Sequence, residues 1–165
     1  MIRFVTAPEE IKVKQPIKLF LGGGITSCPD WQSEIIEKLI EDSESKNHDY
    51  LCDVIVYNPR RPYFPMNIKE EAERQITWEY HKLKESDIIA FWFSNGSLNP
   101  IVLYELGRWG TSDNKPIVIG MDDDYQRRED VEIQTRLSRP DIKIAYDLKN
   151  FYYNLLTEIK KFNKK

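Results

Sequence analysis

The chain has 165 residues, of which 41% are hydrophobic and 31% charged, and its formal net charge at pH 7 is -3. Such a chain is long enough to bury a core but too short for two domains, so we expect one domain over residues 1–165. The slight negative charge offers no broad basic surface, which excludes a nucleic acid polymer as the expected partner.

The amino-terminal residues MIRFVTAPEE lack the apolar region of a signal peptide, and no apolar run approaches the ~20 residues of a membrane span. The two cysteines, Cys28 and Cys52, show no CxxC spacing, so they indicate neither a disulfide framework nor a metal knuckle. We therefore expect a cytoplasmic protein with reduced thiols and no membrane partner.

Short apolar runs alternate with amphipathic stretches along the chain. In chain order, the pattern predicts an edge strand at 2–6 within an extension at 1–15, then strand 17–21, helix 31–43, strand 54–57, helix 69–85, strand 88–93, helix 100–111, strand 117–119, helix 126–137, strand 142–145 and helix 148–162. This β-α alternation predicts an α/β fold of flavodoxin-like, doubly wound type. Its five-stranded, mainly parallel sheet would have the order 2-1-3-4-5 and helices on both faces.

Three glycines, Gly22, Gly23 and Gly24, follow the first predicted strand of this sheet. Their spacing fits neither GxGxxG nor GxxxxGK, so the loop is not a dinucleotide fingerprint or a P-loop. Glycines let a backbone approach a ligand closely, which suggests contact with a sugar or phosphate; a purely structural turn is the alternative. Asp30 then either caps the next helix or binds substrate, and Trp31 either stacks on a base or joins the core.

Asn58, Arg60 and Arg61 follow the second predicted strand, at the same edge of the sheet. Arginine binds phosphate and carboxylate in a forked geometry, so these residues are candidates for binding a 5'-phosphate. Simple surface exposure is the alternative for both arginines.

The strand at 88–93 runs into a polar loop and then into a helix that carries Glu105 among apolar neighbours. Loops of this kind form ligand crevices at the carboxyl edge of open α/β sheets. A carboxylate in such a crevice can act as a nucleophile, and Glu105 is our candidate, against a solvated helix residue. Glu79, on the preceding helix, would handle a proton in the reaction, or else pair with Lys82 at the surface.

Two asparagines in this loop are further candidates, because an amide can hold a sugar hydroxyl or orient Glu105. Asn95 is assigned to substrate binding. Asn99 is assigned to the catalytic group, and, because Pro100 follows it, it is equally a plain helix N-cap. Gln75 could reach a nucleobase edge.

No metal or cofactor is expected. Asp122, Asp123 and Asp124 are consecutive and lack the alternation of a calcium loop, and His48 and His81 are isolated from other ligands. No GxSxG motif supports a catalytic triad.

The segment DIIAFWFSNGSLNPIVLYELGRWG, residues 87–110, resembles the nucleoside 2-deoxyribosyltransferase family, whose nucleophilic Glu lies in an ELG turn after such a strand and loop. The resemblance extends to FLGGGITSCPDWQ, NPRR and DVEIQ, covers residues 15–140, and looks closer to the short, often phage-encoded deoxyribosyltransferase-like branch. It implies Glu105 as the nucleophile. The family's positioning acid, six residues earlier, is replaced here by Asn99, and its other carboxylate corresponds to Glu79.

The leading hypothesis is therefore an enzyme that acts on (deoxy)nucleosides or their 5'-phosphates through Glu105 and transfers deoxyribose to another base or to water. Two alternatives stay open. One is a nucleotide-binding module that has lost the chemistry, which Asn99 favours, and the other is a glycohydrolase of an NAD-type nucleotide.

The resemblance also implies a homo-oligomer in which a neighbouring subunit completes the site. The segment 122–139 is the candidate for this contact, with Tyr125, Arg127, Arg128 and Gln134 as its contact residues. The alternative is a charged surface loop and helix.

Overall fold

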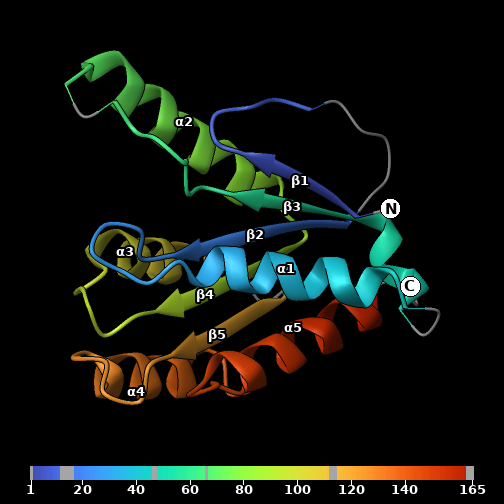
Figure 1. Cartoon of the computed structure of the whole chain (residues 1–165). Helices are drawn as coiled ribbons and strands as arrows, with labels where there is room; N and C mark the ends of the chain where they lie inside the picture. Colours follow the sequence, from blue (N-terminus) through green and yellow to red (C-terminus); the bar gives the residue numbers. More distant parts are fainter. Residues whose placement is uncertain (1, 12–16, 46–47, 66, 112–114, 163–165) are drawn as a thin grey trace.

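The computed structural model describes residues 2–11, 17–45, 48–65, 67–111 and 115–162, so parts of the expected amino-terminal extension lie outside it. Its elements, in chain order, are β1 (Arg3–Thr6), β2 (Ile17–Gly23), α1 (Trp31–Ser43), the short 3-10 helix η1 (Asp49–Asp53), β3 (Val54–Asn58), α2 (Lys69–Glu85), β4 (Ile88–Phe93), α3 (Pro100–Trp109), β5 (Ile117–Met121), α4 (Arg128–Ser138) and α5 (Leu148–Phe162) (Figure 1). Three of the five predicted helices have the predicted bounds. The third ends two residues early, and the fourth begins two residues late and ends one residue late.

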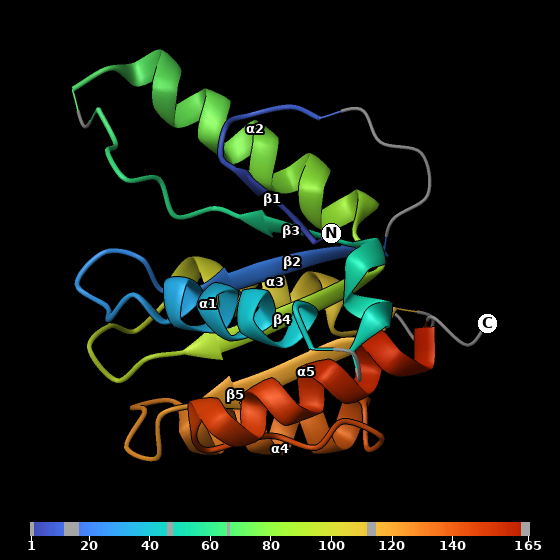
Figure 2. The ribbon, with the colours of Figure 1, turned by 45° about the vertical axis from the view of Figure 1, so that its right-hand side comes forward.

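The five strands form one parallel sheet in the order β1-β3-β2-β4-β5. All arrowheads in Figures 1 and 2 point the same way, so the carboxyl ends of the strands and the loops after them share one edge. The predicted doubly wound α/β fold is confirmed, in a variant strand order.

The observed strand order differs from the predicted order at the two edges of the sheet. The expected strand at 142–145 makes only an isolated bridge, between Gly120 and Ala145, and α5 begins soon after it. The fifth strand is instead β1, which pairs with β3 at the opposite edge in the register Arg3↔Ile55 to Thr6↔Asn58. The order of the four strands between these edges agrees with the prediction.

Each face of the sheet is covered by its own helices, because side chains alternate between the faces along every strand. On one face, α1 and α5 pack through Trp31, Ile35 and Phe151 onto strand residues such as Leu21 and Ala90. These two helices lie in front of the sheet in Figure 1.

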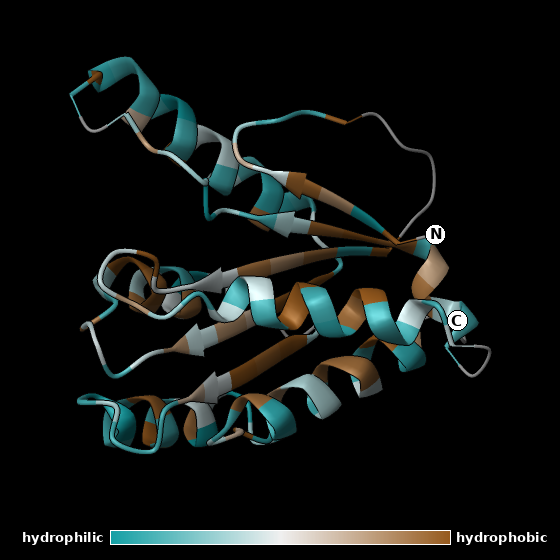
Figure 3. Cartoon of the chain, viewed as in Figure 1, coloured by the Kyte–Doolittle hydropathy of each residue, from teal (hydrophilic) through white to brown (hydrophobic). Residues whose placement is uncertain are grey.

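On the other face, α2, α3 and α4 pack through Trp78, Val102 and Val131 onto strand residues such as Phe91 and Ile119. Figure 3 shows the strands as the most hydrophobic part of the ribbon, as expected for strands buried on both faces.

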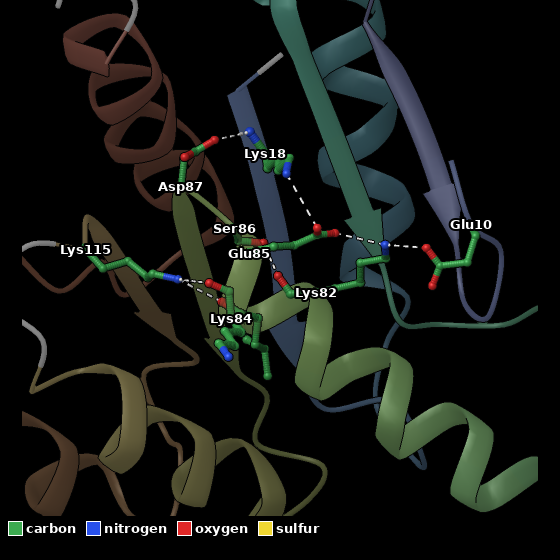
Figure 4. A network of polar contacts seen from close by, with 9 residues as sticks. Glu10, Lys18, Lys82, Lys84, Glu85, Ser86, Asp87 and Lys115 are labelled. Carbon is green, nitrogen blue, oxygen red and sulfur yellow. Dashed lines mark hydrogen bonds and ion pairs between the residues drawn. The ribbon is translucent and has the colours of Figure 1, made fainter. Parts of the chain in front are cut away.

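The carboxyl end of α2 is fixed by a polar network near the amino ends of the strands (Figure 4). Lys82 is 4% exposed, and its Nζ lies 2.8 Å from Glu10 Oε2 and 2.9 Å from Glu85 Oε1. Lys115 Nζ donates to the Leu83 and Lys84 carbonyls at the same helix end. Burial alone would lower the pKa of Lys82, but the hydrogen bonds with the two carboxylates outweigh it and raise the pKa.

Candidate active site

A cavity of about 250 Å³ opens at the carboxyl edge of the sheet, between the glycine loop, α2 and α3. Its lining consists of Phe20, Gly22, Gly23, Gly24, Ile25, Thr26, Pro59, Glu79, Ser97, Asn99, Pro100, Ile101, Val102 and Glu105. The cavity lies where parallel α/β sheets place ligands, since the loops after neighbouring strands meet there.

Two carboxylates face this cavity from different helices. Glu79 comes from α2 and Glu105 from α3, and among the described residues that line the cavity they are the only ionisable side chains. Burial first, and then the charge of Glu79, raise the pKa of Glu105 from its ordinary 4.5 to about 8. Burial also raises the pKa of Glu79, while a hydrogen bond from Gln75 opposes that shift. Both carboxyl groups therefore hold a proton to a higher pH than an exposed glutamate does.

Gln75 connects Glu79 to the loop after β3. It lies one helical turn before Glu79 on α2, and its Nε2 donates to Glu79 Oε1 at 2.7 Å and to the Pro59 carbonyl at 2.8 Å. Among the described residues, none donates a hydrogen bond to the Glu105 carboxylate. The two acids thus have different surroundings.

Asn99 lines the cavity and precedes α3, with Pro100 at the first helical position as predicted. Its backbone is left-handed, with φ 51 and ψ 50, a conformation that asparagine tolerates better than most residues. The side chain makes no cap hydrogen bond. Its Nδ2 donates instead to the Ser94 and Ser97 carbonyls, both at 2.9 Å, so Asn99 shapes the loop that leads into α3.

The glycine loop packs closely against this loop and the sheet. A Cβ on Gly22 would lie 2.8 Å from the Phe91 ring, and one on Gly24 would overlap Asn99 Oδ1 and Cys28 Sγ. These close approaches explain why glycines occupy the wall of the cavity.

Arg60 binds the backbone of the glycine loop. Its Nη2 donates to the carbonyls of Gly24, Cys28 and Pro29, at 3.3, 3.3 and 2.8 Å. Its Nε lies 3.0 Å from Gln32 Oε1 and 3.1 Å from Asp30 Oδ1. The guanidinium is thus engaged within the protein and does not line the cavity.

Three further predicted binding residues, Arg61, Asn58 and Asn95, also lie outside the cavity lining. Arg61 Nη2 donates to Glu71 Oε2 at 2.8 Å. Asn58 Oδ1 accepts from the Arg60 amide, and Asn95 Nδ2 donates to Asp124 Oδ1.

Of the two residues that begin α1, Asp30 caps the helix by accepting from Ser33, and Trp31 is 1% exposed in the core. These positions agree with the structural alternatives that the sequence left open, a helix cap for Asp30 and a core residue for Trp31.

The sequence did not indicate most of the apolar and backbone lining, such as Phe20, Pro59, Ile101 and Val102. Pro59 follows a strand, and Ile101 lies in the first turn of a helix at the same edge of the sheet. These positions were the only sign in the sequence that the two residues line the cavity. Gln75 was considered as a base contact, but its spacing of four residues from Glu79 was the better guide, since such residues share a helix face.

Within the described part of the chain, no group of three or more His, Cys, Asp or Glu side chains could hold a metal ion. Across the same residues, no helix has the length and apolar character to cross a membrane.

The parallel α/β sheet with a two-carboxylate cavity at its carboxyl edge defines a class of small-molecule-binding α/β proteins. A family model described as nucleoside 2-deoxyribosyltransferase like matches residues 16–125, and the chain belongs to this family. Comparison with curated proteins gives no match. Family membership supports a nucleoside-processing activity and agrees with the resemblance on residues 87–110.

Proposed function

We propose that the protein is an enzyme that cleaves the bond between base and sugar in (deoxy)nucleosides, with Glu105 as the nucleophile. The observation that carries this proposal is the pair Glu79 and Glu105, held by two helices in one cavity whose lining, in the part of the chain that the structure describes, has no other ionisable residue. Paired carboxylates with raised pKa values suit a reaction that needs both a nucleophile and a proton donor.

In the proposed reaction Glu105 attacks the anomeric carbon, and the bond from this carbon to the base nitrogen breaks. The electron pair of that bond goes to the base, which takes up the proton held by the Glu79 and Glu105 pair. The resulting glycosyl ester is then attacked by a second base or by water, which returns a proton to Glu79. Transferase and hydrolase differ only in this second acceptor.

We further propose that the substrate is a nucleoside rather than its 5'-phosphate. Both arginines considered for a phosphate are bound to other groups of the protein, Arg60 to loop carbonyls and Arg61 to Glu71. The described lining of the cavity carries two carboxylates and no cationic residue, so a phosphate dianion would be repelled there.

Release of free base tests the proposal. Wild-type protein incubated with a panel of deoxynucleosides, nucleotides and NAD should release base from deoxynucleosides, followed by chromatography, and should exchange bases when a second base is added. Glu105→Gln keeps the shape of the side chain and should lower the rate by at least ~100-fold. Stabilisation by nucleosides without any base release would instead favour a binding module.

The same family resemblance leads us to propose a homo-oligomer, with an interface that differs from the one expected at 122–139. Tyr125 is 3% exposed, and its hydroxyl donates to the Leu98 carbonyl, so it does not present a contact surface. α4 exposes Leu137 at 73%, whereas α2 and α3 together expose Ile76 at 66%, Ile101 at 64% and Tyr104 at 69%. Exposed apolar groups of this size on the two helices that carry the carboxylates support an interface there.

A further inference from the structure

Gln75 is a nearly buried amide whose two N–H groups are both in use. The side chain is 9% exposed, and its Nε2 donates to the Pro59 carbonyl and to Glu79 Oε1. Its own oxygen, Oε1, is buried and has no hydrogen-bond partner among the described residues. This orientation leaves an acceptor unsatisfied, which costs free energy, so the donated hydrogen bonds must hold the amide in place.

The Pro59 carbonyl determines which end of the amide faces Glu79. A carbonyl can only accept, so it requires the NH2 group of Gln75 on its side of the helix. The same NH2 group then also faces the Glu79 carboxylate, at 2.7 Å. A donated hydrogen bond favours the ionised form of a carboxyl group.

Glu105 has the opposite surroundings, because none of the described residues donates to its carboxylate. The polar groups around the pair are Gln75 from α2 and the lining residues Thr26, Ser97 and Asn99, all uncharged, and the charge of Glu79 contributes to the raised pKa of Glu105. The arginines closest along the chain to the two acids are bound elsewhere: Arg74 pairs with Glu71, and Arg108 Nη2 donates to the Tyr80 hydroxyl.

From this geometry we propose that Gln75 is a positioning residue that keeps Glu79 as the ionised member of the pair and leaves the shared proton on Glu105 in the free protein. For its catalytic consequence the inference rests on the proposed function. The proton needed by the departing base is then already in the cavity before the substrate binds, and Glu79 is ready to mediate its transfer. The order of ionisation depends on an amide that does not touch the substrate.

Gln75→Met tests the proposal, since methionine has a similar length and donates no hydrogen bond. With Glu79 less stabilised as an anion, the pH at which the pair loses its first proton should rise by about one unit. The acidic limb of the kcat/KM profile should therefore move up, while the alkaline limb, which reports loss of the second proton, should move less. The bell-shaped pH profile of kcat/KM should therefore become narrower on its acidic side.

Carbon-13 NMR titration of the glutamate side chains gives a second readout that needs no activity. The pKa of Glu79 should rise in Gln75→Met and should not change in the control Glu73→Met, an exposed position on the same helix. If Gln75→Met does not fold, Gln75→Leu is titrated in its place. In a Glu79→Gln background, adding Gln75→Met should no longer move the acidic limb.

The outcomes separate this inference from the proposed function. An unchanged Glu79 pKa together with an unchanged acidic limb rejects the role of Gln75, whatever the activity. A raised Glu79 pKa in a protein that releases no base keeps the role of Gln75 and rejects the proposed function.

Discussion

Glu105 lies where its charge is unfavourable, and this has a consequence for stability. With its pKa raised from 4.5 to about 8, the native protein holds a proton at neutral pH that the unfolded chain releases. The free energy of unfolding contributed by this group is therefore largest below pH 4.5 and falls as the pH rises toward 8. The buried position of Glu105 in the cavity therefore lowers the free energy of unfolding at neutral pH.

Glu105→Gln should therefore stabilise the protein while it inactivates the site. At pH 8 we expect the free energy of unfolding of the variant to exceed that of wild type by roughly 1–3 kcal/mol. Each pKa unit corresponds to ~1.4 kcal/mol, and the total is reduced because Glu105 is partly exposed. The difference between the two proteins should shrink toward pH 5. Urea unfolding at both pH values measures it. Glu73→Gln, on the exposed face of α2, should show no such gain. A gain of equal size at both pH values would contradict the raised pKa.

Arg60 and Arg61 test whether a phosphate is recognised. Because Arg60 binds the glycine loop, Arg60→Ala should weaken binding of a nucleoside and of its 5'-phosphate by similar factors, and Arg61→Ala should change neither much. Binding constants from calorimetry with matched nucleoside and nucleotide measure this. A selective loss of more than about tenfold for the nucleotide would restore the phosphate role, since charge-assisted hydrogen bonds contribute ~1.5–3 kcal/mol.

Among the individual residues, the sequence indicated Glu105 through the ELG motif and Glu79 through the helix before it. Both carboxylates line the same cavity. The sequence did not indicate the protein partners of Arg60, because an arginine next to a strand end has the same sequence context whether it binds a ligand or loop carbonyls. Those carbonyls belong to Gly24, Cys28 and Pro29, more than thirty residues away along the chain, and only the folded loop brings them within reach.

Among the elements, the strands at the sheet edges were the least predictable. Residues 142–145 have the apolar character of a strand, and Ile142 and Ile144 do pack against the core. Backbone pairing with β5 nevertheless reduces to one bridge, because ladder formation depends on the neighbouring strand and on where α5 begins. The long helices were predicted well, since their apolar periodicity and caps are local properties such as the Asp30 cap of α1.

The position of α2 depends on Lys82, and the ion pairs around it are asymmetric in burial. The Lys82 side chain is 5% exposed, whereas Glu85 is 37% and Glu10 is 70% exposed. Lys82→Met would leave carboxylates that water can hydrate, so it should cost at most ~1 kcal/mol. Removing both acids, by Glu10→Gln with Glu85→Gln, would leave a buried cation and should cost ~3 kcal/mol or more.

Urea unfolding of the two variants measures this difference. Glu44→Gln, an exposed position at the end of α1, is the control for the loss of a surface carboxylate. Equal losses for Lys82→Met and the double variant would mean that the network holds α2 through side-chain packing and not through charge.

For the whole molecule, the exposed apolar residues on α2 and α3 predict self-association. Sedimentation at micromolar concentration should show a dimer or larger assembly, and Ile101→Lys with Tyr104→Lys should shift it toward monomer without unfolding. Lys substitution of Leu137, which is 73% exposed on α4, is the matched control and should leave the assembly intact. A wild-type monomer that turns over substrate would reject a site shared between subunits.

The most direct test of the central claim is the mass of the protein during turnover. Wild-type protein mixed with a deoxynucleoside and quenched in acid should gain the mass of one deoxyribosyl group, peptide mapping should locate it on Glu105, and free base should appear in at least the same molar amount. Glu105→Gln should gain nothing. Base released by wild type without any sugar on Glu105, or a sugar attached at another residue, would contradict the assignment of Glu105 as the nucleophile.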